Sequence, residues 1–539
     1  MRTVWAILLI GGGCTDPNEE PSDDGGLDWR SCPLLGEEAP GPTGQCAVAS
    51  LPLWSGIQPD GPMIEVFVQR RLGASPVRDR QLWLVPDLGQ GTASVAPLAA
   101  SLSRELPATD VYLFEHRGVG RSTRLSCPDQ EADDSRGGPE IVEAEARGCV
   151  EALQDRWGGE LAAFSTTDAA RDLEALIGSL RGEQQVVLLG SGYGGRVVSR
   201  LLEISGLEPD AVVLDAPLIE PDAATYDAEF DEVGALLMQR CSAEASCRGA
   251  LGPDPQAKAL DVLGRMQAGA CREAASADEL RLLAGSFLAD PGRAGFAPAL
   301  FHRADRCNEA DVLELSQLIE DDAPPRLDGP VLRWHVALSE HWREPWVPPT
   351  TLQRAVDASA FTQAVGPLQR ELLPLWPRYE PEAGIPALEP SELRSPLLAL
   401  QGALDPVHPS WRLEGWLQPL EPADHHLVRF ADGIGPTLQD PRTEACALSS
   451  LLDFLDAPSL PPEADCRRGT EPLRFDGEPA ESRALLGDPD RYGAGGCSTR
   501  GPGAPIGAPI GAPGSGPWGL VGLGVLLALI RDRRTASRA

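Results

Sequence analysis

Basic residues are scarce in this chain of 539 amino acids. It carries 46 Lys+Arg against 80 Asp+Glu, which gives a formal net charge of −34, and Lys258 is its single lysine. So large an excess of negative charge repels phosphate backbones and anionic lipid headgroups. The charge balance therefore excludes nucleic-acid binding.

Long apolar runs are missing as well. The two candidates, in residues 1–13 and 518–530, fall short of the about 20 apolar residues that a helix needs to cross ~30 Å of hydrocarbon. A stable transmembrane helix is therefore not expected. Hydrophobic residues still make up 42% of the chain and charged residues 23%, which is enough for a large globular core.

The twelve cysteines include no C-x-x-C pair, and the seven histidines are widely scattered. Without thiolates at that spacing, a zinc site is not expected. His335 and His341 are six residues apart, so on a helix they point to different faces, and packing explains them better than metal ligation. We expect no metal ion and no cofactor.

The N-terminus has the order of a secretory signal. One arginine precedes a short apolar stretch in residues 1–13, and Cys14 opens an acidic tether over residues 14–27. Three glycines directly before Cys14 resemble a bacterial lipobox, which predicts a lipidated or processed cysteine. A plain cleaved signal remains the alternative.

The C-terminus predicts a second sorting element. Residues 467–517 form an extension with a Gly/Pro-rich linker that contains Cys497, and a short apolar helix (518–530) and a basic tail (531–539) follow. This order resembles myxobacterial C-terminal sorting segments, which are cut near the cysteine. We therefore expect an exported protein in the cell envelope or on its surface, anchored to the outer membrane by the lipid or by the sorting segment.

Once Cys14 and Cys497 are set aside, ten cysteines remain. So many cysteines favour an oxidising compartment, although sequence alone does not prove how they pair. Pairing each cysteine with its nearest neighbour predicts Cys32–Cys46, Cys127–Cys149, Cys241–Cys247, Cys271–Cys307 and Cys446–Cys466.

Apolar runs alternate with helical patterns through the middle of the chain, which predicts βαβ units and a mostly parallel sheet. The predicted strands are 63–69, 81–86, 111–115, 186–190, 211–215, 396–401 and 426–431, and the predicted helices 93–106, 168–180, 193–204 and 442–455. Residues 217–390 interrupt this alternation with helical segments. We expect an α/β core over 28–216 and 391–466, with 217–390 as a helical lid.

Several segments carry a resemblance to a known family. They read FEHRGVGRSTRLSC (114–127), FSTTDAARDLEAL (164–176), LLGSGYGGR (188–196) and LALQGALDPVHP (398–409), and Cys446 and Cys466 close the series. In this order they resemble the α/β-hydrolase family of tripeptidyl aminopeptidases and proline iminopeptidases, serine peptidases that release residues from peptide N-termini. The resemblance implies an α/β-hydrolase fold: a mostly parallel sheet of about eight strands with a large helical lid insertion.

The nucleophile of that family is absent. Its serine stands at the centre of G-x-S-x-G, and here Gly192 takes that place, followed by the family's Tyr193 and Gly194. Ser191 is one residue early, and a slip of one residue at a strand end turns the side chain to the other side. Asp405, in G-x-x-D-P, matches the acid of the triad, although aspartate before proline also suits a plain turn.

The base and the oxyanion motif also depart from the family. Ile434 stands where the resemblance places the histidine, and no histidine follows His426, so His408 is the one plausible stand-in. The family's H-G-G-P-G is replaced by residues 86–91, in which Pro86 has no N–H and Asp87 would repel an oxyanion. Gly89 and Gly91 keep the turn, so we include them with Tyr193 as binding residues.

These changes favour a catalytically silent hydrolase fold whose cleft binds a peptide or a small amphiphilic ligand, and we expect a monomer. The competing hypothesis is an active peptidase or esterase with Ser191, His408 and Asp405 as displaced catalytic residues. A surface scaffold with an idle cleft is the third hypothesis. The lid offers tryptophans that could line a cleft or pack internally, and the acidic Glu340 and Glu344 that could hold a peptide N-terminus: the tryptophans are Trp334, Trp342, Trp346 and Trp376.

Overall fold

The computed structural model describes most of the chain between residues 25 and 475. The described ranges are 25–34, 43–54, 61–138, 141–322, 327–376, 393–419, 425–463, 466–467 and 470–475. The predicted signal, acidic tether, Cys14, linker, Cys497 and sorting helix lie outside these ranges. Within them, no helix is both long and apolar enough to cross a membrane.

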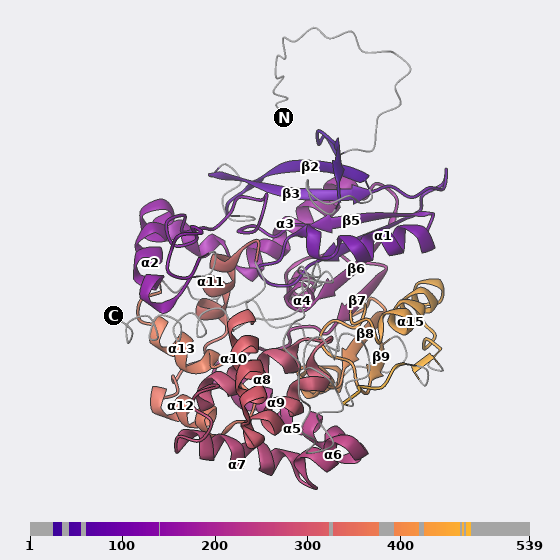
Figure 1. Cartoon of the computed structure of the whole chain (residues 1–539). Helices are drawn as coiled ribbons and strands as arrows, with labels where there is room; N and C mark the ends of the chain where they lie inside the picture. Colours follow the sequence, from indigo (N-terminus) through magenta and orange to yellow (C-terminus); the bar gives the residue numbers. More distant parts are fainter. Residues whose placement is uncertain are drawn as a thin grey trace, which may run out of the picture.

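A nine-stranded sheet forms the centre of the described structure, in the order β1-β2-β3-β5-β4-β6-β7-β8-β9 (Figure 1). Strands β1 to β3 and the β3–β5 pair are antiparallel, and every later neighbour is parallel. The strands are β1 (Arg30–Pro33), β2 (Thr43–Pro52), β3 (Met63–Arg71), β4 (Arg80–Val85), β5 (Thr109–Phe114), β6 (Gln185–Ser191), β7 (Ala211–Asp215), β8 (Leu397–Gly402) and β9 (His425–Phe430). All seven strands expected from the sequence are present, and β1 and β2 are additional.

Both faces of the inner parallel strands, β4 to β8, are buried. In β4, Trp83 and Val85 point into one apolar cluster, while Leu82 and Leu84 point into another, as the two-residue repeat of a strand requires. The first cluster is covered by α3 (Thr166–Leu180) and α4 (Tyr193–Ile204), and the second by α1 (Ala96–Glu105) and α15 (Glu444–Asp456). Helix α3 begins two residues earlier than expected, because the Ser165 hydroxyl caps it by accepting the N–H of Asp168.

The insertion between β7 and β8 is helical, as expected for a lid, and it packs in two parts. Its first helices form a cluster of their own, into which Leu404, Val407 and Ile434 reach from the loops after β8 and β9. The later part, with α11 and α13, joins the apolar cluster of the sheet. The helices are α5 (Tyr226–Ala243), α6 (Ala245–Leu251), α7 (Pro255–Gln267), α8 (Ala277–Ala289), α9 (Ala297–Arg306), α10 (Glu309–Asp321), α11 (Pro330–Glu340), α12 (Pro349–Ala358) and α13 (Val365–Leu372).

Two further helices complete the core, α2 (Glu143–Trp157) and α14 (Ser410–Leu417). Short 3-10 turns cover Thr92–Ser94, Gly158–Ala163 and Ala294–Phe296. Disulfides join each of the five neighbouring cysteine pairs named above. The loops that they close are 6 to 36 residues long, so each bridge fastens a local segment of the core or of the lid.

Candidate functional site

A sharp turn joins β6 to α4 at Gly192. Its backbone has φ 55° and ψ −121°, a conformation that side-chain-bearing residues adopt only under strain and that presents a nucleophile in serine hydrolases of this fold. Neighbouring glycines allow the close approach, since a Cβ on Gly194 would overlap the carbonyl oxygen of Val85 at the end of β4. The elbow geometry is therefore intact, but its apex carries no side chain.

The carboxylate of Asp87 fills the space above that apex. A Cβ on Gly192 would lie 2.5 Å from both Cγ and Oδ1 of Asp87. Oδ1 accepts two backbone hydrogen bonds, from the N–H of Tyr193 at 2.7 Å and from the N–H of Leu88 at 2.8 Å. These two positions, after the elbow and in the loop after β4, are where such hydrolases place their oxyanion hole. The hole is thus formed, and an internal carboxylate occupies it.

Ser191, the proposed displaced nucleophile, is the last residue of β6 and is 2% exposed. Its hydroxyl accepts a hydrogen bond from the Gln439 side chain at 3.4 Å. It lines a small pocket with Asp405, His408 and Ile434, but no hydrogen bond joins Ser191 to His408 in the part of the chain that the structure describes. The three candidate substitutes therefore lie around one pocket without forming a connected triad.

Asp405 and His408 do pair with each other. Asp405 follows β8 and is buried, and its Oδ1 accepts the N–H groups of Val407 and His408 at 2.9 and 3.1 Å. Its Oδ2 lies 3.2 Å from Nδ1 of the His408 ring. Burial works to lower the pKa of His408, yet Asp405, with smaller contributions from Asp87 and Asp215, raises it above the usual value. An acid–imidazole pair thus exists, with the imidazole on the same loop as the acid.

Ile434 occupies the base position as a packing residue. It is fully buried, and its side chain belongs to the lid cluster together with Leu404 and Val407. Its N–H donates to Asp440 at 3.1 Å. Asp215, at the end of β7, fixes the same loop by accepting the N–H and hydroxyl of Thr437. This apolar contact between the sheet and the lid explains why the position is occupied by a large hydrophobic side chain.

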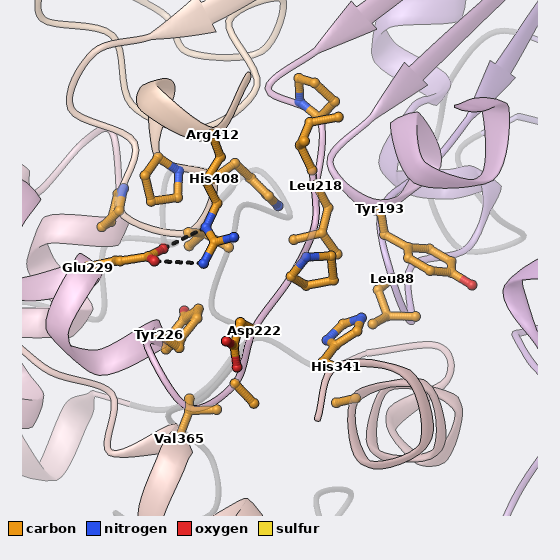
Figure 2. Close-up of a pocket in the computed structure, with 18 of the residues that line it drawn as sticks. Leu88, Tyr193, Leu218, Asp222, Tyr226, Glu229, His341, Val365, His408 and Arg412 are labelled. Atoms are coloured by element: carbon orange, nitrogen blue, oxygen red, sulfur yellow. Dashed lines mark hydrogen bonds and ion pairs between the residues drawn. The ribbon is translucent and has the colours of Figure 1, made fainter. Parts of the chain in front are cut away.

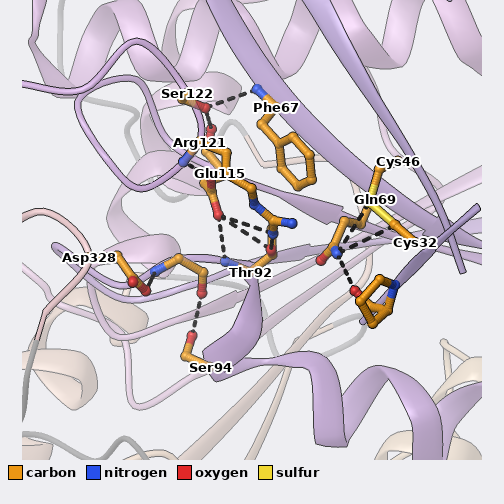
Figure 3. A network of polar contacts seen from close by, with 12 residues as sticks. Cys32, Cys46, Phe67, Gln69, Thr92, Ser94, Glu115, Arg121, Ser122 and Asp328 are labelled. Carbon is orange, nitrogen blue, oxygen red and sulfur yellow. Dashed lines mark hydrogen bonds and ion pairs between the residues drawn. A yellow bond between two sulfur atoms is a disulfide. The ribbon is translucent and has the colours of Figure 1, made fainter. Parts of the chain in front are cut away.

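The glycines of the loop after β4 hold it against the lid. Gly89 has φ 76°, and its carbonyl accepts the N–H of Gly329 at 2.9 Å. The N–H of Gly91 donates to Asp328 at 2.9 Å, and the next residue, Thr92, donates its N–H to Glu115 at 3.0 Å (Figure 3). Gly89 and Gly91 therefore both contact the segment before α11, and the N–H of Gly91 is taken up by Asp328.

Glu340 has a structural partner. Its carboxylate accepts the N–H of Thr166 at 2.9 Å and the hydroxyl of the same residue at 2.5 Å, at the start of α3. That hydroxyl also contacts the Tyr193 hydroxyl at 2.8 Å. Burial raises the pKa of Tyr193, so the phenol stays protonated. The network ties the lid helix α11 to the elbow helix α4 through α3.

A pocket lies beneath the lid, and Tyr193 and His408 are part of its wall (Figure 2). Asp87 lines the same pocket. Most of the lining is apolar: Leu88, Pro217, Leu218, Ile219, Pro221, Ala223, Ala337, Val365, Pro406, Val407 and Pro409. Trp334, Trp342 and Trp376 are buried in the apolar cluster that covers the sheet, and Trp346 packs against this cluster. None of these four lid tryptophans is part of the pocket wall.

Arg412 and Glu229 span one side of the pocket. The guanidinium on α14 forms a two-bonded ion pair with the carboxylate on α5, with distances of 2.7 and 2.6 Å (Figure 2). Arg412 also donates to the carbonyl oxygen of Glu220 and to the Thr225 hydroxyl. This ion pair links the core to the lid beside the cavity. Sequence reasoning missed this pair, because the two residues are far apart in the chain and belong to no motif.

Comparison with known proteins places this geometry in context. Residues 85–336 match the family described as alpha/beta hydrolase fold. Tripeptidyl aminopeptidases of Streptomyces coelicolor and Streptomyces lividans are each 29% identical over 190 residues, which cover 31% of this chain and 34% of theirs. The chain therefore matches about a third of the length of these curated relatives.

Solved structures with a similar chain path include a thermophilic esterase from Thermogutta terrifontis, at 14% identity and a TM-score of 0.34. The match covers 77% of this chain and 99% of the esterase. An esterase from a Rhodococcus species is 13% identical with a TM-score of 0.33, and the match covers 76% of this chain and 99% of that one. With the family match and the parallel sheet, the predicted fold and the predicted family resemblance are confirmed.

Proposed function

We propose that this chain, an α/β-hydrolase-fold protein, has lost serine-hydrolase chemistry and binds a peptide or a small amphiphilic ligand beneath its lid. The observation that carries the proposal is the Asp87 carboxylate, which accepts the N–H groups of Leu88 and Tyr193 and lies over Gly192. One residue thus fills both the place of a serine side chain and the oxyanion hole.

Electrostatics supports the loss of activity. An oxyanion hole accelerates acyl transfer because its donors are aimed at a charge that develops in the transition state, and one donor is typically worth about 10²–10³ in turnover. Here both donors already bind a carboxylate, so a second negative charge would be repelled from the same place. Restoring the serine alone would leave this obstacle in place.

The pocket supports the binding role. Its walls are mainly apolar with a few polar groups, which is the usual lining of a small-molecule site. Such a cavity suits an extended peptide side chain or an amphiphile. The five disulfides suit an oxidising environment, and we include export, envelope anchoring and a monomeric state in the proposal.

An active hydrolase remains the second candidate because one specific pair favours it. Asp405 and His408 are in contact, and Ser191 lines the same small pocket as both. A rearrangement that joined the Ser191 hydroxyl to the imidazole would produce a nucleophile and base beside the acid.

A fluorophosphonate probe separates the two candidates. Purified full-length protein should remain unlabelled, and activated esters and N-terminal peptide substrates should give no burst. Subtilisin-type serine hydrolase added to the same reaction serves as the positive control. Robust labelling that maps to Ser191 and disappears in Ser191→Ala would overturn the silent assignment and establish the displaced triad.

A further inference from the structure

We infer that the pocket beneath the lid recognises an uncharged carboxamide group on an apolar body. Gln369 donates to the carbonyl oxygen of this group, and His341 accepts its N–H. Both side chains come from the lid and line the pocket wall. The inference rests on the proposed binding function and names its ligand class.

Gln369, on α13, offers the pocket a pair of hydrogen-bond donors. Its Oε1 accepts the indole N–H of Trp342 at 2.9 Å. An indole nitrogen only donates, so this bond decides which end of the glutamine amide is the oxygen. The side chain is 6% exposed, and its Nε2 stays accessible and makes no hydrogen bond to the described residues. The Nε2 hydrogens are therefore available to an acceptor in the pocket.

His341, at the end of α11, offers an acceptor. Its backbone is fixed on the wall, because its N–H donates to Ala337 and its carbonyl accepts the N–H of Ala223. The imidazole extends into the pocket (Figure 2) and forms no hydrogen bond with the residues that the structure describes. Burial, with a smaller contribution from Arg196, lowers the pKa of His341 to about 3. A neutral imidazole always keeps one unprotonated nitrogen, which accepts a hydrogen bond.

The two groups belong to one corner of the pocket, since Trp342 follows His341 in the chain and bonds to Gln369. An amide carries its acceptor and its donor on neighbouring atoms, which matches a donor and an acceptor placed in this way. A ketone lacks the N–H, and an alcohol has both functions on a single atom. Leu218 and Val365 are part of the apolar wall that receives the body of the ligand. A few fixed polar groups in an apolar cavity set the orientation of a ligand.

Matched probes test the amide preference on the full chain by isothermal titration calorimetry. N-methylhexanamide, 3-octanone and 3-octanol have nearly the same size and shape and differ in the polar group. We expect the amide to bind about tenfold more tightly than the ketone, because the ketone leaves the His341 acceptor unpaired, and the alcohol to bind no better than the ketone. N-acetyl-leucine methylamide presents the same group in a peptide. Tighter binding than N-methylhexanamide identifies a peptide segment as the source of the amide, and weaker binding a simple aliphatic amide.

Variants assign the preference to residues. His341→Phe keeps a ring and removes the acceptor, so the amide should fall to the affinity of the ketone while the ketone is unaffected. Gln369→Glu keeps an oxygen for the Trp342 N–H and removes the donors, so amide and ketone should both weaken by about tenfold. Gln369→Met, which is uncharged, should show the same loss. Gln239→Glu, at an exposed position on α5 outside the pocket wall, is the control and should leave all affinities unchanged.

The outcomes are distinguishable. Equal binding of amide, ketone and alcohol, or an amide preference that survives both His341→Phe and Gln369→Glu, would overturn the amide recognition while the binding function stands. No binding of any of the four probes would count against the binding function itself. Circular dichroism melting curves of each variant show whether a lost signal reflects unfolding.

Discussion

The N–H of Tyr193 donates to the Asp87 carboxylate at 2.7 Å, across the gap between the loop after β4 and the start of α4. These segments are 106 residues apart in the chain and meet because β4 and β6 are parallel neighbours that end together. Parallel strands bring their carboxyl ends to one edge, where such folds bind their ligands. The contact takes up, within the protein, an N–H group that could otherwise bind an anion at this edge.

Removal of this carboxylate should destabilise the protein. Asp87→Ala leaves the buried N–H groups of Leu88 and Tyr193 without their acceptor, which should lower the free energy of unfolding by about 1–3 kcal/mol. Asp87→Asn should lose less. Urea titration measures both, with the exposed Asp261→Ala as the control. A gain in stability for Asp87→Ala would show that carboxylate desolvation outweighs its two hydrogen bonds.

A serine at the elbow should clash before it reacts. Gly192→Ser places a Cβ 2.5 Å from the Asp87 carboxylate at a backbone φ of 55°, so we expect a loss of about 2 kcal/mol or more and no activity. Gly178→Ser on α3, where a Cβ meets nothing within 4 Å, is the control and should be nearly neutral. Equal stability of the two variants would refute the steric interpretation.

Activity should return only when three positions change together. Gly192→Ser with Ile434→His supplies a nucleophile and a base near Asp405, but Asp87 still blocks both the serine and the oxyanion hole. The triple variant with Asp87→Gly should show a burst with activated esters, and its gain should exceed the product of the single gains because a triad works as a unit. A burst in the double variant that retains Asp87 would contradict the role of this carboxylate.

The Asp405–His408 pair should stabilise the fold most at acidic pH. The folded pKa of His408 lies above the usual value of about 6.5, so the stabilisation is fully present below that value and is lost as the pH rises through the folded pKa. The stability difference between the wild type and His408→Gln should therefore be larger at pH 6 than at pH 9. Histidine NMR resonances report the pKa directly. A titration midpoint below about 6.5 would remove the basis of this expectation.

The disulfides should contribute according to the loops that they close. Cys271 and Cys307 are 36 residues apart, Cys446 and Cys466 are 20 apart, and Cys241 and Cys247 are 6 apart. Loop-closure entropy predicts about 3 kcal/mol for a loop of roughly 20 residues and somewhat more for the longest. Paired Cys→Ala variants, unfolded in urea, test this order. Peptide mapping under non-reducing conditions must find the same five pairs, and free thiols would contradict them.

The sequence identified the inner parallel strands because their apolar runs are continuous and buried on both sides. Strands β1 and β2 were missed, since β1 has four residues that include a cysteine and a proline, and β2 contains a glycine, a proline and several small residues. β1 pairs with β2, and β2 pairs with β3, and no local pattern names these partners. Antiparallel edge strands of this kind are specified by tertiary contacts more than by composition.

Residues of the candidate site that belong to local motifs could be predicted, and contacts between distant segments could not. Gly192 and Ile434 stand within motifs of short local spacing, so their positions could be read from the sequence. The sequence indicates that the Asp87 carboxylate would repel an oxyanion. The hydrogen bond from Tyr193 to Asp87, however, depends on the pairing of β4 with β6, which no local motif predicts. The ion pair between Arg412 and Glu229 joins residues 183 positions apart, and no sequence motif predicts it.

The space shared by Asp87 and a side chain at Gly192 gives the proposed loss of the nucleophile a direction in evolution. If Gly192 changes to serine first, the new Cβ lies 2.5 Å from the Asp87 carboxylate. If Asp87 is replaced first, the buried N–H groups of Leu88 and Tyr193 lose their acceptor. Under the proposed loss of hydrolase chemistry, each single-step path back to a hydrolase passes through a less stable protein. On that proposal, descendants of this chain can explore new ligands far more easily than they can recover a hydrolase reaction.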